Sequence, residues 1–120
     1  EVWQANAAGQ YDMSHPDYPL EKGVFYYRTR LVADESGYYE FETVYPGRYD
    51  IGQDTFRPAH IHYWIRHPGY RELVTQLYFE GDPWNEKERG LDFSHVRPVN
   101  QHHRGDQTWE SCDFDIVLDG

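Results

Sequence analysis

The chain has 120 residues, of which 21 are acidic and 11 basic, so its formal net charge is −10. The length predicts one domain over residues 1–120, and the acidic balance argues against nucleic acid or an anionic membrane as partner. The single cysteine, Cys112, excludes an intrachain disulfide. We expect it to be a small, inert buried residue, which fits the cytosol without excluding secretion.

Aromatic residues make up 18 % of the chain, a bias that favours strands over helices. Short strand-forming stretches alternate with turn-forming clusters of Gly, Pro, Asp and Ser, and no segment shows a helical period. The pattern predicts an all-β fold with little helix, arranged as an antiparallel β-sandwich with long active-site loops. In chain order, strands are expected at residues 2–5, 24–31, 38–44, 59–66, 73–79 and 113–118.

The sequence starts at Glu1 as if in the middle of a strand, so we expect that an upstream segment was removed or left out. Residues 38–44 alternate between two sets of side chains, as in a strand with one buried face. Residues 84–112 are polar and contain Gly and Pro, so we expect a long loop with an exposed turn at 86–89. Its histidines are expected to be solvated: His95, His102 and His103.

The segment Arg57-Pro-Ala-His-Ile-His62 carries the strongest chemical signal. Residues two apart in a strand point to the same face, so the imidazoles of His60 and His62 stand side by side and can reach one metal ion. Taken alone, the pair could equally be two hydrogen-bonded core histidines. No carboxylate follows His62 at the short spacing usual for a site of two histidines and one carboxylate.

Several segments in the same order resemble the intradiol ring-cleavage dioxygenases, the family of catechol and protocatechuate dioxygenases. The resemblance extends over nearly the whole chain. There are three departures from the family: the stretch between Tyr49 and Arg57 is short, the strand that precedes Glu1 is absent, and there is no N-terminal helical region for dimerisation. A homo-oligomer is therefore possible but not indicated. The similar segments are residues 1–11, 36–41, 46–49, 57–62, 75–83 and 114–118.

The resemblance implies a mononuclear Fe(III) site. Tyr11 and His60 would be the equatorial ligands, and Tyr49 and His62 the axial ones, with Tyr49 leaving when substrate binds. Phenolate is a hard anionic donor that forms only where a metal lowers the phenol pKa, whereas zinc prefers Cys, His and carboxylates. Arg57 would stabilise negative charge on the substrate ring.

The resemblance also implies that Gln76 lines the site, and that the partners are a small catechol and O2. The ring would open between its two hydroxylated carbons to give a cis,cis-muconate-type dicarboxylic acid. Protocatechuate, catechol, hydroxyquinol and chlorinated catechols all stay open as substrates. The pocket is expected in residues 12–23, 50–56 and 84–112, and the short 50–56 loop suggests an open site.

Other functions remain possible at this point. A zinc or Fe(II) hydrolase or cupin-like oxygenase could use the two histidines, and a β-sandwich binding module would need no metal. Arg57 could form a structural salt bridge instead of contacting substrate. Tyr78 is expected to be a packing residue, and Trp3 a core or rim residue.

Overall fold

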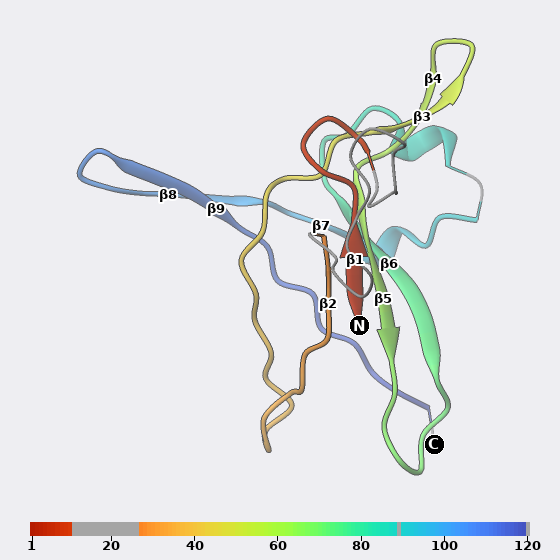
Figure 1. Ribbon diagram of the computed structural model, residues 1–120, viewed down its shortest axis with the longest axis vertical. Helices are drawn as coiled ribbons and strands as arrows, with labels where there is room; N and C mark the ends of the chain where they lie inside the picture. The colour runs from red at the N-terminus through yellow and green to blue at the C-terminus, as the bar shows by residue number, and fades with distance from the viewer. Residues whose placement is uncertain (11–26, 89, 120) are drawn as a thin grey trace, which may run out of the picture.

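The computed structural model describes residues 1–10, 27–88 and 90–119 (Figure 1). Strands dominate these residues, and the helices among them are two single-turn 3₁₀ helices. In the part of the chain described, neither has the length or apolar character to cross a membrane. The elements are β1 (Val2–Gln4), β2 (Arg28–Thr29), β3 (Tyr49–Gly52), β4 (Thr55–Arg57), β5 (His60–Ile65), β6 (Leu73–Phe79), η1 (Asn85–Lys87), η2 (Phe93–His95), β7 (Val96–Arg97), β8 (Asn100–Arg104) and β9 (Gln107–Ser111).

The central sheet has the strand order β2-β1-β5-β6-β7. All neighbours in it are antiparallel except β6 and β7, which are parallel. Strands β5 and β6 pair along their whole length, and this register sets His62 opposite Gln76. The expected strands at 59–66 and 73–79 are therefore confirmed, as is the one at 2–5 to within a residue.

One face of the sheet carries the apolar core. Ile61 and Tyr63 of β5 are buried there, which turns His60 and His62 toward the opposite face. The core also contains Leu77 and Phe79 of β6, together with Val2, Ala59 and Phe114. The alternation of β5 thus separates a packing face from a face free for polar chemistry.

Extended segments without strand pairing cross the core face. Residues 38–44 and 113–118 form no strand, contrary to expectation. Their alternation is nevertheless real, because Tyr39 and Phe41 pack on the core while Tyr38 is exposed. Tyr39 also donates a hydrogen bond from its hydroxyl to the Phe114 carbonyl, 2.6 Å away. Side-chain periodicity decides which face is buried, but a strand also needs a neighbouring backbone to pair with.

Only part of residues 24–31 is strand among those described, at β2, and residues 24–26 lie outside them. The expectation of a mostly antiparallel all-β fold with little helix is confirmed. The arrangement of these strands as a sandwich stays a prediction.

A tight turn at residues 6–10 lies directly against the segment before β3. The Asn6 carbonyl accepts hydrogen bonds from the backbone N–H groups of Gly9 and Gly47, at 3.0 and 2.8 Å. Gly9 has a φ of +83°, and a Cβ atom there would overlap the Arg48 carbonyl. Tyr11 follows this turn but lies outside the described residues. Glycine is required at position 9 for both its backbone angle and its lack of a side chain.

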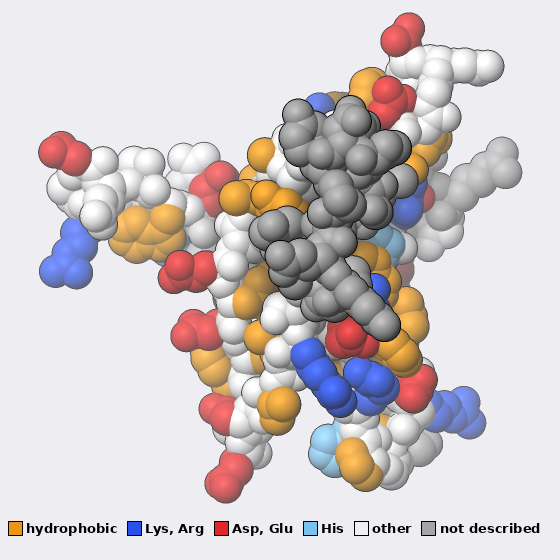
Figure 2. Space-filling view, in the orientation of Figure 1, with side chains coloured by type: hydrophobic (Ala, Val, Ile, Leu, Met, Phe, Trp, Pro, Cys, Tyr) orange, Lys and Arg blue, Asp and Glu red, His pale blue; other side chains and the backbone are white. Residues whose placement is uncertain are grey.

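Two hairpins project from the sheet, β3–β4 and β8–β9 (Figure 1). The β8–β9 hairpin corrects the prediction of a long loop over 84–112, and every residue in its strands is exposed. Its two-residue Gly105-Asp106 turn is a known hairpin signal, but the strands are too polar to show alternation. Figure 2 shows acidic side chains near the outer ends of the projecting segments. The radius of gyration, 15.9 Å, exceeds the roughly 13–14 Å of a compact domain of this length.

Candidate metal centre

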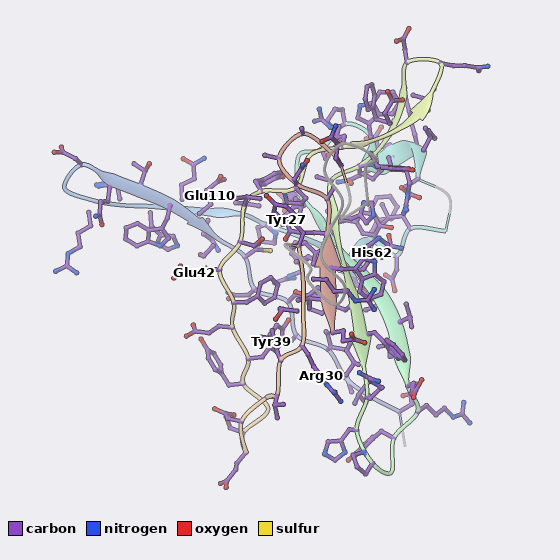
Figure 3. All side chains as sticks on the ribbon, viewed as in Figure 1. Tyr27, Arg30, Tyr39, Glu42, His62 and Glu110 are labelled. Carbon is purple, nitrogen blue, oxygen red and sulfur yellow. The ribbon has the colours of Figure 1, made fainter. Side chains whose placement is uncertain are left out.

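The two histidines of β5 converge as the sequence predicts. Their Nε2 atoms lie 3.1 Å apart, on the face of β5 opposite the core. Figure 3 labels His62 near the middle of the central sheet. Two nitrogens bound at about 2.1 Å to one ion, in positions about 90–95° apart, would be separated by about 3.0–3.1 Å. The spacing is a hydrogen-bond distance between the two imidazoles, and it also suits two neighbouring positions around a single metal ion.

The ring of His60 is held in one orientation by its second nitrogen. Nδ1 lies 2.7 Å from the carbonyl oxygen of Pro58, a residue that is fully buried. A carbonyl only accepts, so Nδ1 carries the proton and the Nε2 of neutral His60 offers its lone pair. Such a backbone partner is typical of a metal-binding histidine, because it fixes the tautomer and the ring plane.

Burial keeps both imidazoles neutral. It lowers the pKa of His60, whose side chain is almost inaccessible at 2 % exposure. For His62, burial is again the main cause, followed by the nearby His60 and Arg57, and the pKa falls to about 4. Only neutral imidazole binds a metal, so these shifts leave both ligands competent across the physiological pH range.

A row of paired residues crosses four strands of the central sheet, from Arg28 of β2 through Trp3 and His62 to Gln76 of β6. Trp3 of β1 pairs with His62 on one side and with Arg28 of β2 on the other. The Trp3 ring stacks on His62 with ring centres 4.8 Å apart and planes 2° from parallel. The Arg28 guanidinium lies 4.8 Å from the Trp3 ring centre. The prediction of Trp3 as a core or rim residue missed this contact, which depends on the β1–β5 register.

Arg57 of β4 is fixed by two partners. Its Nε lies 3.2 Å from Oε2 of Glu88, and its Nη2 donates to Oε1 of Gln76 at 2.9 Å. The Tyr78 hydroxyl donates to the same oxygen at 2.6 Å. The salt bridge considered for Arg57 is thus present, and Gln76 joins Arg57 to the strand beside His62.

One expectation near Arg57 needs correction. Glu88 was expected in an exposed turn, but its side chain is only 15 % exposed and pairs with Arg57. Tyr78 is buried, as expected of a packing residue, and its hydroxyl also donates to Gln76, two residues earlier on β6. Burial is the main reason that the pKa of Tyr78 is raised. The role of Glu88 is not visible in the local sequence, because its partner Arg57 lies on a different segment.

Tyr49 begins β3 and stands directly opposite Arg57 of β4. Directly opposite residues in an antiparallel pair share one face, so the side chains of Tyr49 and Arg57 leave the hairpin on the same side. Its side chain is accessible, at 41 % relative exposure. The predicted ligand Tyr11 lies outside the described residues. The described part of the chain brings together His60 and His62 directly, and Tyr49, Arg57 and Gln76 through strand pairing and hydrogen bonds.

Within the described ranges, His, Cys, Asp and Glu form no group of three or more that could hold a metal ion. Of the histidines in the expected loop, His102 and His103 are exposed, as predicted, whereas His95 is partly buried. His95 lies 3.1 Å from the Thr75 hydroxyl, and His102 stacks on Trp109.

A family model described as "Dioxygenase" matches residues 1–120. Chlorocatechol 1,2-dioxygenase from Rhodococcus opacus is 34 % identical over 134 aligned residues, covering 98 % of this chain and 51 % of that protein. The protocatechuate 3,4-dioxygenase beta chain from Burkholderia cepacia is 43 % identical over 88 residues, covering 69 % and 37 %.

The solved structure of 3-chlorocatechol 1,2-dioxygenase from Rhodococcus opacus 1CP superposes with a TM-score of 0.82. It is 26 % identical, with 98 % of this chain and 51 % of that chain covered. The chain thus spans about half the length, or less, of the curated relatives it matches. The match over its full length, together with the histidine pair and its surroundings, shows that the chain belongs to the intradiol ring-cleavage dioxygenase family.

Proposed function

We propose that this chain holds Fe(III) through Tyr11, Tyr49, His60 and His62 and cleaves a catechol between its two hydroxylated carbons with O2. The product would be a cis,cis-muconate-type dicarboxylic acid. The observation that carries the proposal is the pair of Nε2 atoms 3.1 Å apart. Relatives named as chlorocatechol and catechol 1,2-dioxygenases support the reaction class.

The residues present fit a ferric ion. His60 and His62 are held neutral, and a position beside Arg57 is occupied by Tyr49, whose phenolate would be a hard anionic donor. A site of hard oxygen donors and imidazoles favours iron, whereas zinc more often takes sites that include thiolates. Bound iron would supply a Lewis acid that holds both catechol oxygens and withdraws electron density from the ring.

Arg57 would stabilise negative charge that develops on the bound ring. Glu88 and Gln76 hold its guanidinium from two sides, so the charge is in place before substrate arrives. The overall charge of −10 repels an anionic substrate, and this fixed cation would offset that repulsion locally. Tyr49 would take a catechol proton on its Oη when substrate displaces it from the iron. Its side chain is accessible enough for this exchange.

The test is a visible absorption spectrum of the iron-loaded protein, before and after catechol is added without oxygen. We expect a broad tyrosinate-to-iron band that moves to longer wavelength with catechol. A colourless iron-loaded protein would contradict the proposal and leave a zinc site or a binding module. Substrate choice follows from kcat/KM for catechol, 3-chlorocatechol, protocatechuate and hydroxyquinol measured in parallel.

The role of Tyr49 is tested by replacing it with phenylalanine. Tyr49→Phe should retain iron, change the absorption band and lower kcat at least about 100-fold, the scale of a lost proton-transfer group. Tyr38→Phe is the matched control, because Tyr38 is an exposed tyrosine whose hydroxyl donates to the nearby Glu40. Unchanged turnover in Tyr49→Phe would remove the assigned role.

A further inference from the structure

Asp82 lies between two of the segments that carry the proposed ligands. It follows β6 and precedes η1, and its side chain is only 4 % exposed. A nearly buried carboxylate is costly unless its charge and its lone pairs are satisfied. At Asp82 they are satisfied by groups from distant parts of the chain.

The first partner is Arg48, the residue immediately before Tyr49. Its Nε lies 3.1 Å from both carboxylate oxygens of Asp82. Arg48 and Asp82 are 34 residues apart in sequence, so this contact closes a long loop. It holds the start of β3, where Tyr49 lies, against the end of β6.

The second partner is the residue immediately before His60. The backbone N–H of Ala59 donates to Oδ2 of Asp82 at 3.0 Å. A third bond is local, from the Trp84 backbone N–H to Oδ1 at 2.9 Å. One carboxylate therefore connects the residue beside Tyr49 with the residue beside His60.

We propose that Asp82 is a positioning residue that holds Tyr49 within reach of the ion bound by His60 and His62. This inference rests on the proposed function. A carboxylate is required at this position because both of its oxygens accept hydrogen bonds. The groups described above that contact Asp82 are all N–H donors. An amide at this position would turn an NH2 group toward one of these donors and would lose the charge that attracts Arg48.

The variant Asp82→Asn tests the proposal, with Asp92→Asn as the matched control. Asp92 accepts the backbone N–H of the residue two positions later at 2.9 Å, as Asp82 does, but it is exposed. The readouts are the tyrosinate absorption band, iron affinity by chelator competition, and far-ultraviolet circular dichroism of the metal-free protein. We expect Asp82→Asn to weaken iron binding about 10- to 100-fold, as for other residues that orient metal ligands, while Asp92→Asn behaves as wild type.

The double variant Asp82→Asn/Tyr49→Phe shows whether Asp82 acts through Tyr49. If it does, the double variant has the absorption band of Tyr49→Phe alone, because a tyrosine already lost cannot be misplaced. Additive changes in the band would overturn the proposal. A wild-type protein without the band would overturn the proposed function together with this inference, whereas a normal band in both wild type and Asp82→Asn overturns this inference alone.

Should Asp82→Asn fail to fold, substitutions of Arg48 decide the matter. Arg48 is 45 % exposed, so its replacement disturbs little packing and leaves the two backbone bonds to Asp82 in place. Arg48→Lys keeps a cation for Asp82 and should preserve the band. Arg48→Met should reduce the band toward that of Tyr49→Phe, and a wild-type band in Arg48→Met would overturn the proposal.

Discussion

Individual side chains prepare the histidine pair before any ion binds. His60 is oriented by the Pro58 carbonyl, and His62 lies flat against the Trp3 ring. Burial lowers the pKa of both imidazoles. The metal-free protein therefore carries two neutral, buried nitrogen ligands. Because folding keeps them from binding protons, they lower the free energy of unfolding at acidic pH.

That cost has a defined pH dependence. The pKa of His62 falls from 6.5 to about 4 on folding, so between these values the unfolded chain binds a proton that the folded chain does not. Stability of the metal-free protein should consequently fall as pH is lowered from about 6.5 toward 4. Unfolding temperatures measured at pH values from 7.5 to 4.5 would show this slope.

Substitution of His62 by glutamine should make the slope shallower, because the group responsible is removed. His67→Gln is the control, since His67 is a histidine of the same chain that is exposed instead of buried. Equal slopes in wild type and His62→Gln would show that His62 does not contribute to this pH dependence.

The stack of Trp3 on His62 should matter for iron binding. Trp3→Ala removes the surface that fixes the imidazole plane, and we expect iron affinity to fall about tenfold. Trp3→Phe retains a flat ring and should keep most of the affinity. The chain provides a matched control in Trp109→Ala, because Trp109 stacks on His102 of a projecting hairpin, with ring centres 5.3 Å apart. Equal affinities in Trp3→Ala and Trp109→Ala would argue against an orienting role.

At the scale of elements, β5 is the strand that organises the site. Its alternation places Ile61 and Tyr63 in the core and the two histidines on the other face, while β1 and β6 supply Trp3 and Gln76 on either side of His62. The segment before β3 is held next to this strand by the Asp82 bonds and by the packing of Gly9 on Gly47 and Arg48.

The close contact of Gly9 with Arg48 and the positive φ of Gly9 make separate contributions to stability, and two glycines of this chain can distinguish them. Gly9 and Gly69 both have a φ of +83°, but a Cβ would overlap the Arg48 carbonyl at Gly9 and meet nothing within 4 Å at Gly69. Gly69→Ala should cost about 1–2 kcal/mol, the left-handed backbone penalty. Gly9→Ala should cost about 1–3 kcal/mol more because of the overlap. Urea unfolding of both variants measures the difference, and equal losses would mean that the turn shifts freely.

For the whole molecule, stability should be distributed unevenly. The central strands β5 and β6 carry buried side chains on the core face, whereas β8 and β9 are exposed throughout. Backbone amides of β5 and β6 should therefore exchange with solvent most slowly, and those of the β8–β9 hairpin among the fastest. Hydrogen exchange followed by mass spectrometry tests this. Slow exchange in the hairpin would indicate that it is covered in solution.

The sequence by itself determined the all-β class, the strands β1, β5 and β6, and the candidate residues on β5. These follow from local periodicity, since alternation and residue type are properties of neighbours in the chain. Extended segments at 38–44 and 113–118 had the right buried side chains but no strand pairing, because pairing depends on a second backbone. The β8–β9 hairpin escaped prediction because its exposed strands have no apolar face to reveal them.

Only the tertiary structure decided which distant groups serve the site. The ion pair of Arg57 with Glu88, the hydrogen bond of Arg57 to Gln76, the ring of Trp3 on His62 and the bonds of Asp82 to Arg48 and Ala59 all join different segments. Each depends on strand register or loop path, which single-residue patterns do not encode. The local sequence indicates which residues can act as ligands, whereas contacts between residues far apart in the chain orient them.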